Sequence, residues 1–215
     1  IRDRGSPLCS ACQKVFSGGV LEVSRSNFNG ILLRGFAVSQ YSKPAATMVH
    51  ELKEKSQTFL AVAMAKPMAK ALTAEFARNG YSSSVCLIPM PSKRASFEKR
   101  GFNPSLLLAK KICDQLRKEN FSKVQVENCL KLNRNVLDQA SQVGLTRRQN
   151  LVEAISLVRA PQAQEIWLVD DVVTTGSTLL EAARCLSAEG FRVAGFIVFA
   201  ETLHKNQQKI RAAAN

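Results

Sequence analysis

The residues best suited to chemistry lie in one segment, residues 166–178, with the sequence IWLVDDVVTTGST. Four apolar residues precede two acids, Asp170 and Asp171. Two more apolar residues follow, and then a polar run, Thr174-Thr175-Gly176-Ser177-Thr178. Hydroxyls and unpaired backbone N–H groups at the start of a helix bind phosphate monoesters. Gly176 has no Cβ and lets the backbone approach closely. We therefore predict that the polar run binds a phosphate.

The two acids suit another part of the same ligand, because carboxylates repel phosphate. Neighbouring carboxylates can accept hydrogen bonds from both hydroxyls of a vicinal diol, and they can hold Mg²⁺ directly or through water. A phosphate at one end and a diol at the other describe a ribose 5-phosphate. Ligands of open α/β sheets bind at the carboxyl ends of strands, where this segment is expected to lie. We therefore predict Asp170 and Asp171 as the catalytic pair.

The segment resembles the signature of type I phosphoribosyltransferases: an apolar strand, two acids, two apolar residues and TTGxT. A second block is similar to the PxP…R…RGFN block of the ComF family, with Pro104 where that family usually has Gln: Ile88-Pro89-Met90-Pro91, Arg94 and Lys99-Arg100-Gly101-Phe102-Asn103. A third block approximates the family's R…Q…L…R…N spacing: Arg134, Gln139, Leu145, Arg148 and Asn150. The resemblance covers about residues 41–200.

The resemblance implies a ligand, phosphoribosyl pyrophosphate bound with Mg²⁺. Its 5′-phosphate would lie on the polar run of residues 174–178. Its pyrophosphate would lie at the loop after residue 89, where three cations are the expected contacts, since guanidinium groups bind such anions bidentately: Lys93, Arg94 and Arg100. Further arginines would belong to a mobile flap over the site: Arg134, Arg147 and Arg148.

The cysteines raise the question of zinc. Cys9 and Cys12 form a CxxC, a spacing that lets two thiolates bind one zinc, but a structural zinc site needs four ligands and the sequence has no second CxxC. The ComF family often begins with a Cys-rich zinc element, so the resemblance implies that this pair is a remnant of it and a Zn²⁺ ligand pair. The other cysteines are expected to be small buried residues: Cys86, Cys113, Cys129 and Cys185.

The elements that position these residues indicate an α/β fold, a type I phosphoribosyltransferase-like parallel sheet flanked by helices. The order strand, loop, helix, strand after residue 165 describes a βαβ unit. Residues 1–40 are predicted as a small irregular N-terminal segment with lead-in strands, and residues 41–215 as the domain. The expected strands are one or two within Phe28–Tyr41, then Ser84–Pro89, Val124–Leu132, Ile166–Val169 and Arg192–Phe199.

Helices are expected from the 3.6-residue spacing of apolar positions and from capping residues. Pro67 is expected to kink or divide the second of them. Residues 1–27 and 91–103 are expected to be irregular. The expected helices are residues 43–55, Phe59–Arg78, Pro104–Lys118, Leu145–Ala154 and Thr178–Glu189.

Composition and charge narrow the classes of protein to which this chain can belong. The 215 residues carry 30 Lys+Arg and 17 Asp+Glu, a formal charge of +13, and residues 92–148 alone contribute +8. So basic a segment indicates either a polyanionic partner (nucleic acid or a phosphorylated small molecule) or a solvated cationic surface. No apolar run approaches the roughly 18–20 residues that span a bilayer. Residues 1–9 lack a signal-peptide pattern, so we expect no membrane insertion and a cytoplasmic location.

Three functions remain open. The first is a ComF-like protein of DNA uptake or natural transformation, which binds phosphoribosyl pyrophosphate and contacts single-stranded DNA and the uptake machinery. The second is a phosphoribosyltransferase of base salvage that transfers ribose 5-phosphate to an unidentified acceptor. The third is a ligand-sensing module without turnover. The motif of residues 166–178 is compatible with all three, because binding and catalysis use the same residues.

Overall fold

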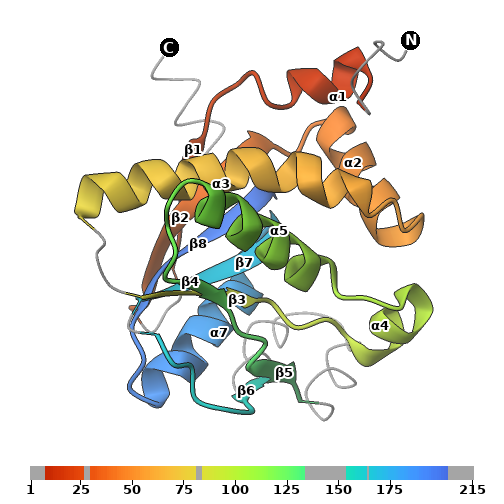
Figure 1. The fold of residues 1–215 in the computed structure, drawn as a ribbon. Helices are drawn as coiled ribbons and strands as arrows, with labels where there is room; N and C mark the ends of the chain where they lie inside the picture. The colour runs from red at the N-terminus through yellow and green to blue at the C-terminus, as the bar shows by residue number, and fades with distance from the viewer. Residues whose placement is uncertain (1–7, 27–29, 81–83, 134–153, 164, 203–215) are drawn as a thin grey trace.

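The computed structural model describes residues 8–26, 30–80, 84–133, 154–163 and 165–202, and the account below concerns these residues. Their centre is a six-stranded sheet in the order β1-β2-β8-β7-β3-β4, parallel except for the antiparallel β1–β2 pair (Figure 1). A separate antiparallel pair joins β5 to β6. The strands are β1 (Leu21–Ser26), β2 (Leu32–Gln40), β3 (Val85–Pro89), β4 (Val124–Val126), β5 (Leu130–Leu132), β6 (Ile155–Leu157), β7 (Glu165–Val173) and β8 (Val193–Glu201).

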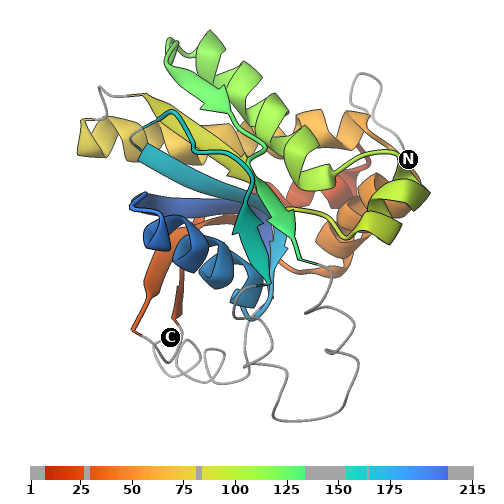
Figure 2. The same cartoon turned by 90° about the horizontal axis from the view of Figure 1, so that it is seen from below.

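Helices cover both faces of this sheet, as Figures 1 and 2 show. One face packs against α2 (Lys43–Glu54), α3 (Phe59–Asn79) and α5 (Pro104–Lys118), and the other against α7 (Ser177–Ala188). Successive strand residues point to opposite faces, so each strand contributes to two cores. Leu87 and Val169 belong to the first core, and Ile88 and Leu168 to the second. The predicted α/β fold class is confirmed.

The longest helix shows how packing overrides a local signal. α3 continues through Pro67 without division. An internal proline costs a helix about 3 kcal/mol, but Met64, Met68 and Leu72 on the inner face of α3 are fully buried. Gly80 ends the helix with a left-handed φ of 62°. None of the helices in the described part of the chain is both long and apolar enough to cross a membrane.

The expectation that residues 1–27 are irregular is wrong for its described part. A short helix, α1 (Ser10–Lys14), is followed by β1, which pairs with β2. The alternation in β1 was not evident from sequence because one of its two buried side chains is charged: Val23 and Arg25. The division of the chain at residue 40 stays a prediction.

Three other expectations need correction. Within residues 91–103 the chain forms a helix, α4 (Arg94–Arg100), which an Arg94–Glu98 ion pair of 2.6 Å supports. The segment 124–132 holds two strands of different sheets, β4 and β5. β7 does not end at Val169 but continues to Val173, because β8 goes on pairing with it after its other neighbour, β3, has ended. The helix expected at residues 145–154 lies almost wholly outside the described residues.

Candidate functional site

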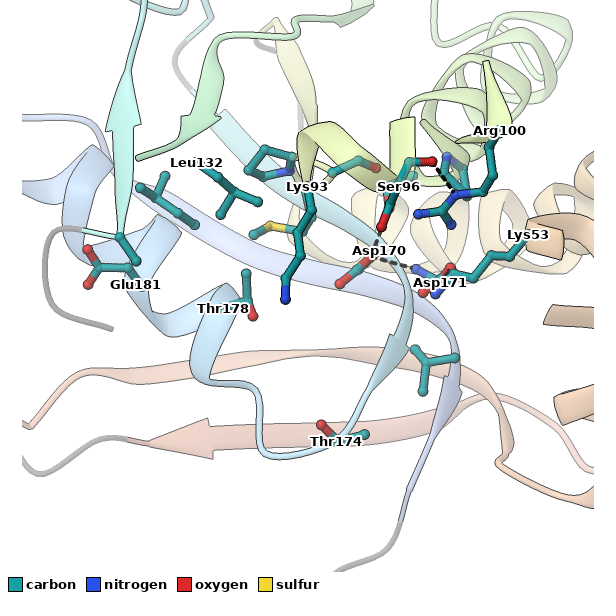
Figure 3. A pocket seen from close by; sticks show the side chains of 18 residues that line it. Lys53, Lys93, Ser96, Arg100, Leu132, Asp170, Asp171, Thr174, Thr178 and Glu181 are labelled. Atoms are coloured by element: carbon teal, nitrogen blue, oxygen red, sulfur yellow. Dashed lines mark hydrogen bonds and ion pairs between the residues drawn. The ribbon is translucent and has the colours of Figure 1, made fainter. Parts of the chain in front are cut away.

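A cavity of about 400 Å³ opens where β3 and β7 end, at the carboxyl edge of the sheet (Figure 3). Six elements besides β7 contribute lining residues: α2, α4, the start of α5, the first turns of α7, β5 and β6. Because parallel strands end at this edge, segments far apart in sequence meet here. Of the predicted site residues, the cavity is lined by Asp170, Asp171, Thr174, Thr178, Lys93 and Arg100.

Asp170 is half-buried at the floor of the cavity. Its Oδ1 accepts hydrogen bonds from the Ser105 hydroxyl at 2.8 Å and from the Asp171 backbone N–H at 3.0 Å. Desolvation, followed by repulsion from Asp171, raises the pKa of Asp170 to about 7. A carboxyl poised there exchanges its proton at neutral pH, and a cation or hydroxyl donor placed beside it favours the ionised form.

Asp171 lies on the other side of the strand and is 3 % exposed. Its Oδ2 forms an ion pair of 2.6 Å with Lys53 Nζ of α2 (Figure 3). A buried carboxylate is tolerated when a cation neutralises it. Lys53 is therefore part of the site, although it was not among the predicted site residues.

The polar run forms the turn between β7 and α7. Gly176 caps α7 with a left-handed φ of 75°. Thr175 Oγ1 lies 2.8 Å from Ser177 Oγ and accepts a hydrogen bond from the Ser177 N–H at 3.4 Å. Thr174 and Thr178 line the cavity on either side of this turn. Because Thr178 lies in the first turn of α7, the amino end of a twelve-residue helix is placed at one end of the cavity, an arrangement that favours an anion.

The basic helix α4 forms another wall. Lys93, Ser96 and Arg100 line the cavity, and the Arg100 Nε donates to the Ser96 carbonyl at 2.9 Å. Arg94 is not brought into the cavity: its side chain is 70 % exposed and pairs with Glu98 at 2.6 Å. The predicted group of three pyrophosphate contacts is therefore divided, with two at the cavity and one facing solvent.

The start of α5 shows the structural role of Asn103, the asparagine of the RGFN block. Asn103 is 8 % exposed, its side-chain carbonyl accepts from the Ser105 and Leu106 N–H groups, and its amide donates to the Met90 carbonyl at 2.9 Å. These bonds cap α5 and fix it to the end of β3. Ser105, which sequence analysis did not identify, is thereby held against Asp170.

The remaining wall is apolar and was also missed. Met90, Leu132 and Ile155 line it, and the last two come from β5 and β6, which pair across a gap of more than twenty residues in the sequence. Such a pairing leaves no local signal. The wall offers a dry surface suited to a flat, weakly polar group.

Cys9 and Cys12 lie apart from the cavity, at the start of α1. Hydrogen bonding from the Cys12 backbone N–H lowers the pKa of the Cys9 thiol, whereas desolvation raises the pKa of the Cys12 thiol, so only Cys9 is shifted toward the thiolate that binds zinc. Within the described residues, however, no group of three or more potential metal ligands comes together, so this pair supplies two of the four ligands that a zinc site needs. Zinc stays a prediction. The flap residues lie outside the described residues: Arg134, Arg147 and Arg148.

Comparison with known proteins agrees with this geometry. A family profile described as "Phosphoribosyl transferase domain" matches residues 103–213. "DNA utilization protein YhgH" of Salmonella typhimurium is 28 % identical over 158 residues, 72 % of this chain and 66 % of the relative. The Escherichia coli K12 protein of that name is 26 % identical over 153 residues, 71 % of this chain and 65 % of the relative.

A third relative covers more of the chain. "Competence protein F" of Haemophilus influenzae is 25 % identical over 200 residues, 85 % of each protein. The chain spans only about two thirds of the length of the YhgH relatives. The profile match covers more than half of the chain and contains Asp170, Asp171 and the polar run of residues 174–178. The chain therefore belongs to the phosphoribosyl transferase domain family, as a ComF-family, phosphoribosyltransferase-like protein.

Proposed function

We propose that the cavity binds phosphoribosyl pyrophosphate together with Mg²⁺, and that the protein acts in DNA uptake with contact to single-stranded DNA. One observation carries the ligand assignment: both ends of the glycine turn before α7, a carboxylate pair and three cations line one cavity of about 400 Å³. That volume lies within the range of small-molecule sites. The 5′-phosphate would lie on the turn before α7, and the ribose hydroxyls would face Asp170.

The pyrophosphate would lie toward α2 and α4. Lys53, Lys93 and Arg100 line this part of the cavity and supply positive charge for an anion that carries several negative charges. Lys53 takes the place that sequence analysis gave to Arg94. Since Lys53 already neutralises Asp171, a ligand phosphate would compete with that carboxylate for it.

The carboxylates fit Mg²⁺ only together with the ligand. Mg²⁺ usually keeps several waters and binds one or two carboxylates plus substrate phosphates. Asp170 and Asp171 offer that number of carboxylates and no all-protein cage. When bound, Mg²⁺ would neutralise charge on the pyrophosphate leaving group. The residues of this chain would hold the ribose, the 5′-phosphate and the outer pyrophosphate oxygens in place.

The apolar wall supports a second candidate, transfer of ribose 5-phosphate to a nucleobase. In that reaction the acceptor nitrogen bonds to the anomeric carbon, the bond from that carbon to pyrophosphate breaks with its electron pair leaving on pyrophosphate, and the acceptor's proton passes to solvent. Met90, Leu132 and Ile155 offer the flat apolar surface that a base requires. Lys93 and Arg100 would stabilise the departing charge.

Contact with single-stranded DNA is supported by α4 and by the names of two relatives, "Competence protein F" and "DNA utilization protein YhgH". Single-strand binding combines cations that follow the backbone with aromatic side chains on which bases stack. Phe97 is 47 % exposed and open to a stacked base, whereas Phe102 and Phe121 pack against the core. Phe97 belongs to α4, and four cations lie in or next to that helix: Lys93, Arg94, Lys99 and Arg100.

The ligand assignment is tested by titration calorimetry with phosphoribosyl pyrophosphate, with and without Mg²⁺. We expect Mg²⁺-dependent binding that the double variant Asp170→Ala, Asp171→Ala abolishes. Asp114→Ala is the matched control, because that carboxylate lies on the outside of α5 with half its side chain exposed. Unchanged binding by the double variant would overturn the site. Turnover with the common nucleobases, measured on the same samples, separates the transferase from a binding protein.

The DNA assignment is tested by the binding of a single-stranded oligonucleotide at several salt concentrations. We expect affinity to fall steeply with salt, and to fall further when Lys99 and Arg100 are replaced by Glu. Phe97→Ala should cost about 1–3 kcal/mol, the usual contribution of one stacked base. The control is Arg192→Glu, because this exposed residue lies just before β8, at the amino ends of the parallel strands and away from the cavity. A flat salt response would favour the small-molecule enzyme.

A further inference from the structure

An arginine lies beneath the phosphate-binding turn without lining the cavity. Arg25 of β1 is 6 % exposed, and its guanidinium makes three contacts. The Nε donates to the Thr174 carbonyl at 3.0 Å, the Nη1 to the Ser24 carbonyl at 2.9 Å, and the Nη2 forms an ion pair of 3.2 Å with Glu201. One side chain thus joins β1, the end of β8 and a turn that lies 149 residues further along the chain.

The aliphatic part of Arg25 also touches the turn. A Cβ added to Gly176 would lie 2.5 Å from the Arg25 Cγ and 2.9 Å from its Cβ, so the arginine stem occupies the space that any larger residue would need. Two features therefore require glycine at position 176: the left-handed φ of 75° and the close approach of the Arg25 side chain. The guanidinium and the stem together determine where the turn lies.

An ion pair taken out of water rarely adds stability, so stability does not account for the buried charge of Arg25. Glu201, its partner, is 2 % exposed. In a trans peptide the carbonyl and the next N–H point in opposite directions. A Thr174 carbonyl held by Arg25 therefore directs the Thr175 N–H away from Arg25, and it fixes the backbone of Thr174, which lines the cavity.

We propose that Arg25 is a positioning residue for the 5′-phosphate turn, acting through the Thr174 carbonyl and through Gly176. This inference rests on the proposed function. The Arg25–Glu201 pair holds the turn in its anion-binding conformation before ligand arrives, so that binding does not have to order it. We expect the effect to be confined to the phosphate end of the cavity, since the hydrogen bonds of the Arg25 guanidinium run to Ser24, Thr174 and Glu201.

The experiment compares two ligands that occupy different ends of the cavity, ribose 5-phosphate and Mg²⁺-pyrophosphate. Arg25→Lys keeps the charge near Glu201 but has no fork of donors, and Arg25→Met keeps the stem without the guanidinium. We expect Arg25→Lys to weaken ribose 5-phosphate about tenfold, as for one lost charge-assisted hydrogen bond, and to change pyrophosphate affinity less than twofold. The ribose 5-phosphate affinity of Glu201→Gln should lie between that of Arg25→Lys and that of wild type. Arg34→Met, an exposed cation on β2, is the control.

Amide hydrogen exchange supplies a readout that needs no ligand. We expect faster exchange at residues 175–177 in Arg25→Lys and unchanged exchange in β3. Equal weakening of both ligands, or unchanged exchange in the turn, would overturn the positioning role and leave Arg25 a structural residue. If wild type binds neither ligand, the proposed function fails; in that case the exchange result still decides whether Arg25 holds the turn. Arg25→Lys and Glu201→Gln carry the test if Arg25→Met does not fold.

Discussion

The turn before α7 and the helix α4 lie on different sides of one cavity, and the groups that we propose for anion binding are held by different means in the two (Figure 3). The turn presents backbone N–H groups and is supported from behind by Arg25 and Glu201, which are 6 % and 2 % exposed. α4 presents long side chains and is held by ion pairs on the surface, including Lys99–Glu54, in which the lysine is 74 % exposed. The turn is thus preorganised, whereas α4 can adjust its contacts.

This difference suggests a division of labour. A preorganised backbone site costs little to order and suits the 5′-phosphate that the proposed ribose ligands share. Exposed lysines and arginines hold ligands weakly but respond to charge over a distance, which suits a pyrophosphate that enters and leaves or a nucleic acid that passes. Substitutions in the turn should therefore have large, local effects, and those in α4 small, salt-dependent ones.

The strongest test of the preorganised side is Gly176→Ala. The new Cβ meets the Arg25 stem at 2.5 Å and φ is 75°, so the turn has to move. A misplacement of about 1 Å can cost an enzyme on the order of a hundredfold in rate, and we expect a loss of similar size in ribose 5-phosphate affinity by calorimetry. Gly80→Ala is the matched control, with φ of 62° and open space around the added Cβ. If both variants bind normally, the turn is not rigid.

A second test concerns the two lysine–carboxylate pairs at this edge. Lys53→Met leaves Asp171, whose side chain is 4 % exposed, without its cation, and we expect unfolding free energy to fall by about 2 kcal/mol. Lys99→Met breaks the exposed Lys99–Glu54 pair and should cost less than about 0.5 kcal/mol. Urea unfolding measures both. Adding Asp171→Asn to Lys53→Met should recover more than half of the loss; no recovery would mean that the ion pair is not its cause.

Asp170 gives a pH-dependent test. Its pKa in the folded protein is raised to about 7, so the folded state binds more protons than the unfolded state between pH 4 and 7 and loses stability as the pH rises through that range. Asp170→Asn removes this cost. Because the half-buried carboxyl remains partly solvated, we expect the variant to be more stable than wild type by about 1–2 kcal/mol at pH 8 and by nearly nothing at pH 4. A pH-independent difference would contradict the raised pKa.

The same contrast explains which residues could be predicted from sequence. The residues 166–178 segment and the start of α5 carry local signals: an apolar strand, a glycine turn, and Asn103-Pro104 as a helix start. Lys53 and Arg25 reach the site because of which helix and which strand pack beside β7, and no spacing in the sequence encodes that. Because Arg25 is a charged residue type, its buried position gave no strand signal, and both β1 and the contact of Arg25 with the turn were missed.

Prediction failed differently at α4. Arg94 and Arg100 are equivalent in the sequence, six residues apart in a basic segment, and only the helix that forms there separates them. A rotation of 100° per residue over six positions turns their side chains by about 240° relative to each other. One therefore faces the cavity and the other the solvent. Only the prediction of a helix, rather than a loop, would have distinguished them.

The smallest expected effect follows from that geometry. Arg100→Ala removes a cation from the cavity, and we expect affinity for phosphoribosyl pyrophosphate with Mg²⁺ to fall about tenfold. Arg94→Ala breaks only an exposed pair with Glu98 and should change affinity less than twofold. Calorimetry at two salt concentrations measures both, and added salt should reduce the Arg100 effect because exposed charges are screened. Equal effects of the two substitutions would mean that α4 turns toward the ligand on binding, in which case Arg94 regains the role that the sequence suggested.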